Sequence, residues 1–239
     1  MHVDHPSYPL FVRLLSAIAK LHLFLLAIFT TVSCFAAEPG PDYELVSKVE
    51  PDADAEFFGG PHIDIVTEVY RRRTDDSPAF KIVLSSLADP SRKELFFAYD
   101  RAATAELSPD GQWFIVNDRP FRGQCAPRLF KHQSGLKFAE VKTARIRARA
   151  IDFFVRYNKY PASIREHMIG EGDCIVESEI WGEDSKALLL RIAKGRTGEP
   201  IWIQSWRCVY DLKTGKLTTD LRTLNRDSIS PGKYLAPKK

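Results

Sequence analysis

Four carboxylates lie close together near residue 180, and paired carboxylates are the groups that hydrolyse glycosidic bonds. They are Glu177, Glu179, Glu183 and Asp184. Alternation along a strand would place Glu177 and Glu179 on one face, and the solvated side of a sheet carries the same pattern. We interpret this face as the solvent-facing side of a sheet. A small hydrolase of envelope polymers, using these carboxylates with His62 or His167, is kept as the alternative.

Motifs for other reactions are missing from the sequence. Ser108 and Ser185 fall in expected turns, and no G-x-S-x-G nucleophile elbow is present. The glycine-rich stretches GEGDC and AKGRTGEP lack the spacing of a P-loop or a dinucleotide-binding fingerprint. His62, His132 and His167 are scattered, and no C-x-x-C pair occurs. The sequence therefore predicts no metal centre, no cofactor and no particular catalytic residue.

Residues 1–36 have the layout of a secretory signal. Two basic residues precede an apolar run over 21–32, and small residues then lead into a polar, proline-rich segment. We expect cleavage between Ala36 and Ala37. Two alternatives stay open: a lipoprotein signal in which Cys34 is acylated, and an uncleaved anchor. The sequence thus predicts an exported protein of bacterial type, periplasmic or extracellular, which meets the membrane only through a lipid on Cys34 or an uncleaved signal.

The charge of the chain is nearly balanced, with a formal net charge of +3. Capture of DNA or RNA needs a concentrated basic face that releases counterions. The run Arg71-Arg72-Arg73 is the local exception, and we interpret it as the solvated end of a strand. We therefore expect no nucleic-acid partner; an envelope protein or polymer is the expected partner.

Three cysteines follow the signal segment: Cys125, Cys174 and Cys208. An exported location permits disulfides, but three thiols form at most one bridge within the chain. Cys174 with Cys208 is the expected pair, because both fall in predicted strands of the C-terminal half. Sequence does not show the geometry on which pairing depends.

The rest of the chain divides into an arm and one domain. Residues 37–60 are rich in Pro, Gly and acids and show no sustained period, so we expect a linker or arm. Residues 61–235 contain stretches such as HIDIVTEVYRRR, AFKIVLSSL and KELFFAYDRAATAEL, which have the β-branched and aromatic content of strands and are separated by turn residues. We expect these residues to form a single, mainly β domain.

Three motifs resemble repeats of β-propellers of the TolB and WD-repeat type. LSPDGQWFIV carries the S-P-D-G turn that links two strands of a blade, with Pro109, Asp110 and Gly111 shaping the turn. IWGEDSKALLLRI is similar to a second copy around Asp184, and the D-x-x-T-G-K turn of WRCVYDLKTGKL, with Gly215, resembles the hairpin that closes a blade. The resemblance implies blade-like hairpins and carries no catalytic residue. Since a ring needs at least four blades of about 40 residues each, we expect no closed propeller.

One amphipathic helix is expected near 142–159. Its apolar side would comprise Ile146, Ala150, Phe153 and Tyr157, and its polar side Arg145, Arg149, Asp152 and Arg156. The fold class that follows is α+β: two antiparallel propeller-like β-meanders with one helix between them, whose Phe153 and Tyr157 face packs on a sheet.

Four aromatic residues crowd into the second meander: Trp181, Trp202, Trp206 and Tyr210. The last three share parity, so they project from one side of any strand that runs without a bulge. Such rings either fill a core or form an exposed binding platform. Because no catalytic signature is present, the sequence predicts an exported, envelope-associated binding module of unknown ligand that uses this surface.

Overall fold

The computed structural model describes residues 39–50, 63–73, 79–100, 103–120, 123–170, 174–195 and 201–231. The chain divides into two units, residues 1–37 and 38–239, and all of the described residues belong to the second. The predicted signal at 1–36 therefore lies outside the described residues. Within the described part of the chain, no helix is long and apolar enough to cross a membrane.

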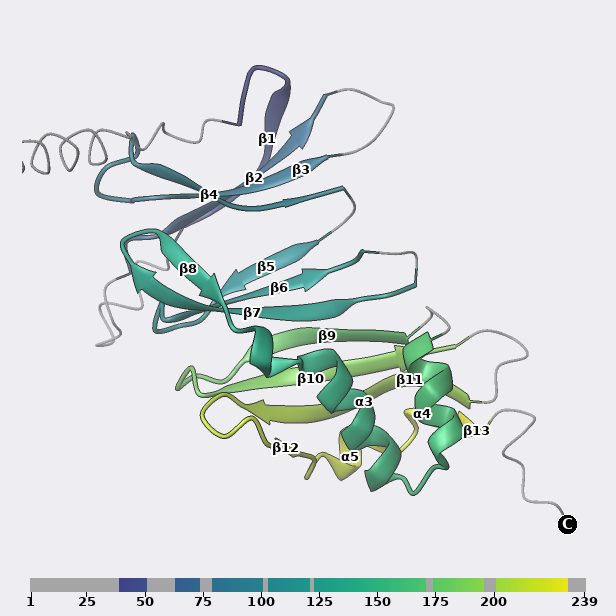
Figure 1. Ribbon diagram of the computed structural model, residues 1–239. Coiled ribbons are helices and arrows are strands. Elements are labelled where there is room, and N and C mark those ends of the chain that lie inside the picture. The colour runs from purple at the N-terminus through teal and green to yellow at the C-terminus, as the bar shows by residue number, and fades with distance from the viewer. Residues whose placement is uncertain are drawn as a thin grey trace, which may run out of the picture. The chain divides into compact units, whose positions relative to one another are not determined.

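The second unit is built mainly from three antiparallel sheets, which follow one another along the chain (Figure 1). Sheet 1 contains β1 (Tyr43–Val49), β2 (Val66–Arg72), β3 (Phe80–Ser85) and β4 (Lys93–Tyr99). Sheet 2 contains β5 (Thr104–Leu107), β6 (Trp113–Asp118), β7 (Ala126–Ser134) and β8 (Lys137–Glu140). Sheet 3 contains β9 (Cys174–Trp181), β10 (Ala187–Lys194), β11 (Ile201–Asp211) and β12 (Leu217–Thr218), and β13 (Ile229–Pro231) also pairs with β11.

The mainly β character agrees with the sequence, but the number of sheets differs. The strands expected in the first meander separate into sheets 1 and 2, because β4 and β5 are consecutive without pairing. The hydrophobic pattern marks strands and says nothing about which of them pair. Residues 37–60, predicted as a linker or arm, include β1 at the edge of sheet 1. Most side chains of β1 are exposed, so no hydrophobic period marked it.

Helices connect sheets 2 and 3 along the chain. They are the 3-10 turn η1 (Lys142–Ala144), α3 (Ile146–Tyr157) and α4 (Ala162–Gly170), and a short α5 (Arg222–Asn225) follows β12. The helix predicted near 142–159 corresponds to α3. The sequence did not predict α4, which begins directly after Pro161, in agreement with the preference for proline at helix starts.

The buried face of α3 differs from the predicted one. The buried residues are Ile146, Ala150, Ile151, Phe154 and Val155. Phe153 is half-buried and Tyr157 is exposed. Phe154 meets Trp206 of sheet 3 edge-on, with 5.0 Å between ring centroids. The helix therefore faces the core with Ile151 and Phe154, whereas Phe153 and Tyr157 lie at the border of the core.

A central strand of sheet 2, β6, is buried on both faces. Phe114 and Val116 of β6 pack with Ile82 and Leu84 of sheet 1. Ile115, which points the other way, packs in a second cluster with α3, α4 and sheet 3. Strands covered on both sides have continuous apolar runs, which explains why WFIVND shows no alternation.

The S-P-D-G turn between β5 and β6 is held by its own side chains. Ser108 Oγ donates to Asp110 Oδ1 at 2.6 Å and accepts the N–H of Trp113 at 2.9 Å. Asp110 Oδ1 also accepts the N–H of Gln112 at 3.0 Å. Gly111 has φ +67°, a conformation that glycine adopts at the lowest steric cost. The positive φ predicted for Gly111 is confirmed.

The turns of sheet 3 follow the same chemistry. Between β9 and β10, Ser185 has φ +55°, and its Oγ accepts the backbone N–H of Asp110 at 2.9 Å, so the turns of sheets 2 and 3 touch. Between β11 and β12, Asp211 Oδ1 accepts the N–H of Thr214 at 2.6 Å, and Gly215 has φ +65°. The D-x-x-T-G-K hairpin is therefore present.

Replacing Gly111 by alanine should destabilise the protein. Alanine would be strained at φ +67°, and its Cβ would lie 3.4 Å from Ile63 Cγ1. The expected loss is about 1–2 kcal/mol in the free energy of unfolding, measured by urea denaturation. Gly170→Ala is the control, because Gly170 has no positive φ and nothing within 4 Å of an added Cβ. Equal stability of the two variants would contradict the role assigned to the turn.

Candidate functional site

One side of sheet 3 faces away from the core, and we call it the outer face of sheet 3. Its side chains are those that alternate with the buried residues of the central strands. They are Ile175, Glu177, Glu179 and Ile180 on β9, Leu189, Arg191 and Ala193 on β10, and Trp202, Gln204, Arg207 and Val209 on β11. The surface predicted from the sequence thus contains charged, aliphatic and aromatic groups.

The four aromatic residues predicted for this surface are divided between core and solvent. Trp206 is 1% exposed and Trp181 and Tyr210 are also buried, whereas Trp202 is 55% exposed. Ile192 pairs with Trp206 but Lys194 pairs with Ile203, so β11 carries one extra residue between these pairs. A bulge of this kind reverses the alternation. The shared parity of Trp202, Trp206 and Tyr210 therefore does not place them on one face.

Trp206 belongs to the aromatic core between sheet 3 and α3. Besides Phe154, its ring lies 5.9 Å from that of Phe153 and 6.0 Å from that of Tyr157. Trp202 instead lies over Gly195, where any added side chain would collide with the indole. Of the four predicted binding residues, Trp202 is the exposed one.

The carboxylates of the outer face are held by arginines. The Glu177 carboxylate accepts a hydrogen bond from the Arg191 guanidinium, and its Oε2 lies 3.4 Å from Arg119 Nη2. Glu179 accepts two bonds from Arg207, at 2.6 and 3.0 Å, and lies 3.4 Å from Arg191. These groups form a ladder of alternating charge across the strands, which is a usual way to stabilise a solvated sheet face.

The other acidic residues of the predicted cluster lie in the turn after β9. Asp184 Oδ1 accepts the N–H of Lys186 at 3.0 Å, and the backbone and side chain of Lys186 lower the pKa of this carboxyl. Glu183 is exposed. A general acid requires a raised pKa, so the direction of the shift at Asp184 is opposite to that of an acid catalyst.

A shallow groove of about 610 Å³ runs along the outer face where it meets sheet 2. Sheet 2 contributes Thr104, Asn117 and Arg119, sheet 3 contributes Glu177 to Ile180 with Leu189 and Arg207, and α5 contributes Leu224. Ile180 is 60% exposed and Leu224 53%. The groove therefore combines an apolar strip with a charged border.

The predicted disulfide between Cys174 and Cys208 is not present. Cys125, Cys174 and Cys208 are buried free thiols. β9 and β11 flank β10 on opposite sides, so their backbones are about 9–10 Å apart, which exceeds the roughly 7 Å limit between the Cα atoms of a bridge. Burial raises the pKa of Cys125 and Cys174 to about 11 and that of Cys208 to about 12.

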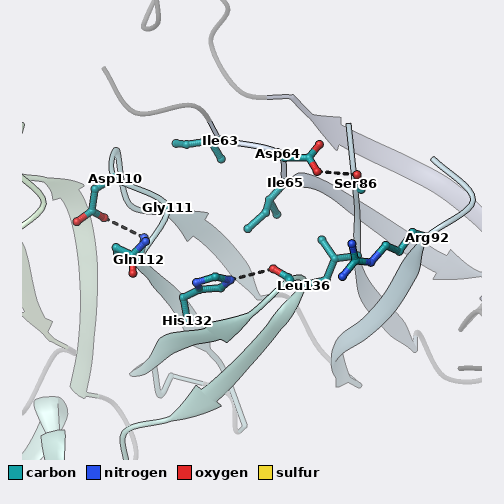
Figure 2. Close-up of a pocket in the computed structure, with 11 residues that line it drawn as sticks. Ile63, Asp64, Ile65, Ser86, Arg92, Asp110, Gly111, Gln112, His132 and Leu136 are labelled. Carbon is teal, nitrogen blue, oxygen red and sulfur yellow. Dashed lines mark hydrogen bonds between the residues drawn. The ribbon is translucent and has the colours of Figure 1, made fainter. Parts of the chain in front are cut away.

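A second hollow lies between sheets 1 and 2 and has a volume of about 210 Å³ (Figure 2). Its lining comes from the residues before β2, the turn after β3, the S-P-D-G turn and the β7–β8 hairpin. The polar members are Asp64, Ser86, Arg92, Asp110, Gln112 and His132, and the apolar members include Ile63, Ile65 and Leu136. No sequence motif pointed to this hollow, because its residues are spread over more than seventy positions.

Neither of the described histidines singled out from the sequence, His132 and His167, lies among the carboxylates of the outer face. His62 lies outside the described residues, and His167 is half-buried on α4. His132 lies in the second hollow, between sheets 1 and 2. Across the described ranges, no group of three or more His, Cys, Asp or Glu side chains is arranged to hold a metal ion.

Comparison with known proteins gives no match: no family model, no curated protein and no solved structure shows significant similarity to the chain.

Replacing Trp206 and Trp202 by alanine should have very different effects. Trp206→Ala removes a buried ring and should lower the free energy of unfolding by about 3–5 kcal/mol. Trp202→Ala removes an exposed ring and should cost less than about 1 kcal/mol. Urea denaturation of both variants measures the difference, and losses of similar size would contradict the positions assigned to the two side chains.

Proposed function

We propose that the chain is an exported, envelope-associated binding module that acts through the outer face of sheet 3. The observation that carries this proposal is the exposed Trp202 on the same face as an apolar strip with a charged border. Tryptophan is among the commonest anchors of protein interfaces, and an apolar centre with a polar rim is the usual anatomy of such surfaces. The expected ligand is a protein or polymer of the envelope.

The order of the sheets supports a second proposal, that each sheet is a propeller-like blade. Strands β1–β4, β5–β8 and β9–β12 each form a meander in chain order. The S-P-D-G turn joins β5 to β6, and the D-x-x-T-G-K turn joins β11 to β12, which are the kinds of hairpin the resemblance implies. Three sheets are fewer than the four blades that a ring requires.

The alternative of a small hydrolase has no supporting observation among the described residues. Glu177 and Glu179 bond arginine side chains across the face. The binding function is therefore the proposal that the geometry supports better.

Binding through the outer face can be tested with two matched variants. Ile180 and Val49 are both strand aliphatics that are 60% exposed, one on the outer face of sheet 3 and the other on sheet 1. Wild-type protein, Ile180→Ser, Trp202→Ala and Val49→Ser would be used to recover bound material from the native cell envelope. We expect one component to be recovered with wild type and Val49→Ser and to be at least about tenfold depleted with the other two variants.

Thermal melts of the four proteins provide the folding control. Equal recovery by all four, or equal loss with Val49→Ser, would show that the outer face of sheet 3 is not the binding surface.

A further inference from the structure

The hollow between sheets 1 and 2 has the composition of a small-ligand site. Ile63, Ile65 and Leu136 form an apolar part of its wall. A volume of about 210 Å³ equals the space of about seven water molecules. Ligand pockets are mostly apolar with a few polar groups that orient the ligand, so the polar groups here should determine which ligand fits.

Arg92 provides the positive charge of this hollow. It precedes β4 and is exposed, and its guanidinium lies against Gly135 in the β7–β8 hairpin, where an added Cβ would collide with it. Gly135 has φ +57°. Its positive φ and its close contact with the Arg92 guanidinium therefore both favour glycine at this position. In the described part of the chain, no carboxylate forms an ion pair with Arg92. The guanidinium is thus positioned at the hollow with its hydrogen-bond donors open to a ligand.

His132 and Gln112 lie on the sheet 2 side of the hollow (Figure 2). His132 Nε2 lies 2.9 Å from the carbonyl oxygen of Gly135. A carbonyl only accepts hydrogen bonds, so Nε2 carries the proton and Nδ1 is the nitrogen left for other contacts. The ring is also fixed by Phe138, 5.1 Å away between centroids. Arg92 and His132 therefore approach the same glycine from different sheets.

Asp64 also lies in the lining of the hollow. Its carboxylate accepts hydrogen bonds from Ser86 Oγ and from the N–H of Ala88, both at 2.7 Å, and these bonds fix its position in the lining. The planar carboxylate of a small acid matches the fork of the Arg92 guanidinium, with which it can form two parallel hydrogen bonds.

We propose that this hollow binds a small monocarboxylate, with the carboxylate on Arg92 and an aliphatic body of a few carbons against Ile63, Ile65 and Leu136. Two sources share this chemistry: a free short-chain acid and the C-terminal residue of a peptide. The site lies on sheets 1 and 2, away from the outer face of sheet 3, so it does not depend on the binding function proposed above.

Calorimetric titration of the full chain with three probes tests the chemistry. The probes are 4-methylpentanoate, N-acetyl-leucine and the uncharged 4-methylpentanamide. We expect 4-methylpentanoate to bind at least about tenfold more tightly than the amide, since a charged hydrogen-bonded pair is lost in the amide. Binding of N-acetyl-leucine as well assigns the site to peptide ends, and its failure to bind assigns it to free acids.

Two arginine variants test the position of the carboxylate. Arg92→Gln should weaken 4-methylpentanoate binding at least about tenfold. The matched control is Arg156→Gln, because Arg156 is exposed on α3 and its guanidinium bonds the carbonyl of Asp152 on its own helix. Both arginines are exposed, so both variants should keep the wild-type melting temperature. The proposal is overturned if the acid binds wild type no better than the amide, or if Arg92→Gln binds as well as Arg156→Gln.

Discussion

A buried amide, the side chain of Asn117, bonds the edge of sheet 3 to sheet 2. Its Nδ2 donates to the carbonyl of Ser178 at 3.0 Å and to Thr104 Oγ1 at 3.1 Å. Its Oδ1 accepts the N–H of Ser178 at 2.8 Å and Ser178 Oγ at 3.1 Å. The amide therefore bonds both backbone groups of Ser178, as a neighbouring strand would. Unpaired backbone groups are costly in a buried position, so this contact favours one position of β9 against β6.

β9 needs such a partner because it is the last strand of sheet 3. Two residues before Ser178, the N–H of Val176 donates to the carbonyl of Cys125 at 3.2 Å, and Cys125 forms an isolated parallel bridge with Ile175. Sheet 2 thus satisfies part of the free edge of β9 with one side chain and one loop residue. Covering an edge in this way also prevents pairing with other chains.

This contact lies in the groove on the outer face of sheet 3. Asn117 and Ser178 are themselves part of the groove lining, between Thr104 on one side and the charge ladder on the other. On the opposite side of sheet 3, α3 packs Phe154 against Trp206. With its inner side occupied in this way, sheet 3 turns its outer face, including the exposed Trp202, away from the core.

The sequence predicted the features that depend on local backbone chemistry. The S-P-D-G turn with positive φ at Gly111, the D-x-x-T-G-K hairpin and the helix at α3 depend on residues close together in the chain. Turn types are specified by such short-range constraints.

Features that depend on pairing between distant segments were not predicted. The bulge in β11 moved Trp202 to the other face from Trp206, and it is defined only by the register against β10. The bonds of Asn117 to Ser178 and the approach of Arg92 to Gly135 join residues that no spacing rule connects. β1 was not predicted as a strand, because most of its side chains are exposed and its sequence shows no hydrophobic alternation.

Native-state hydrogen exchange at the Ser178 amide, followed by NMR in wild type and Asn117→Ala, tests this account most directly. Exchange reports the opening of individual hydrogen bonds. Loss of the Asn117 acceptor should accelerate exchange at Ser178 at least about tenfold more than at Val176, whose N–H bonds the Cys125 carbonyl. If exchange at Ser178 is unchanged in Asn117→Ala, the Asn117 side chain does not hold β9 against β6.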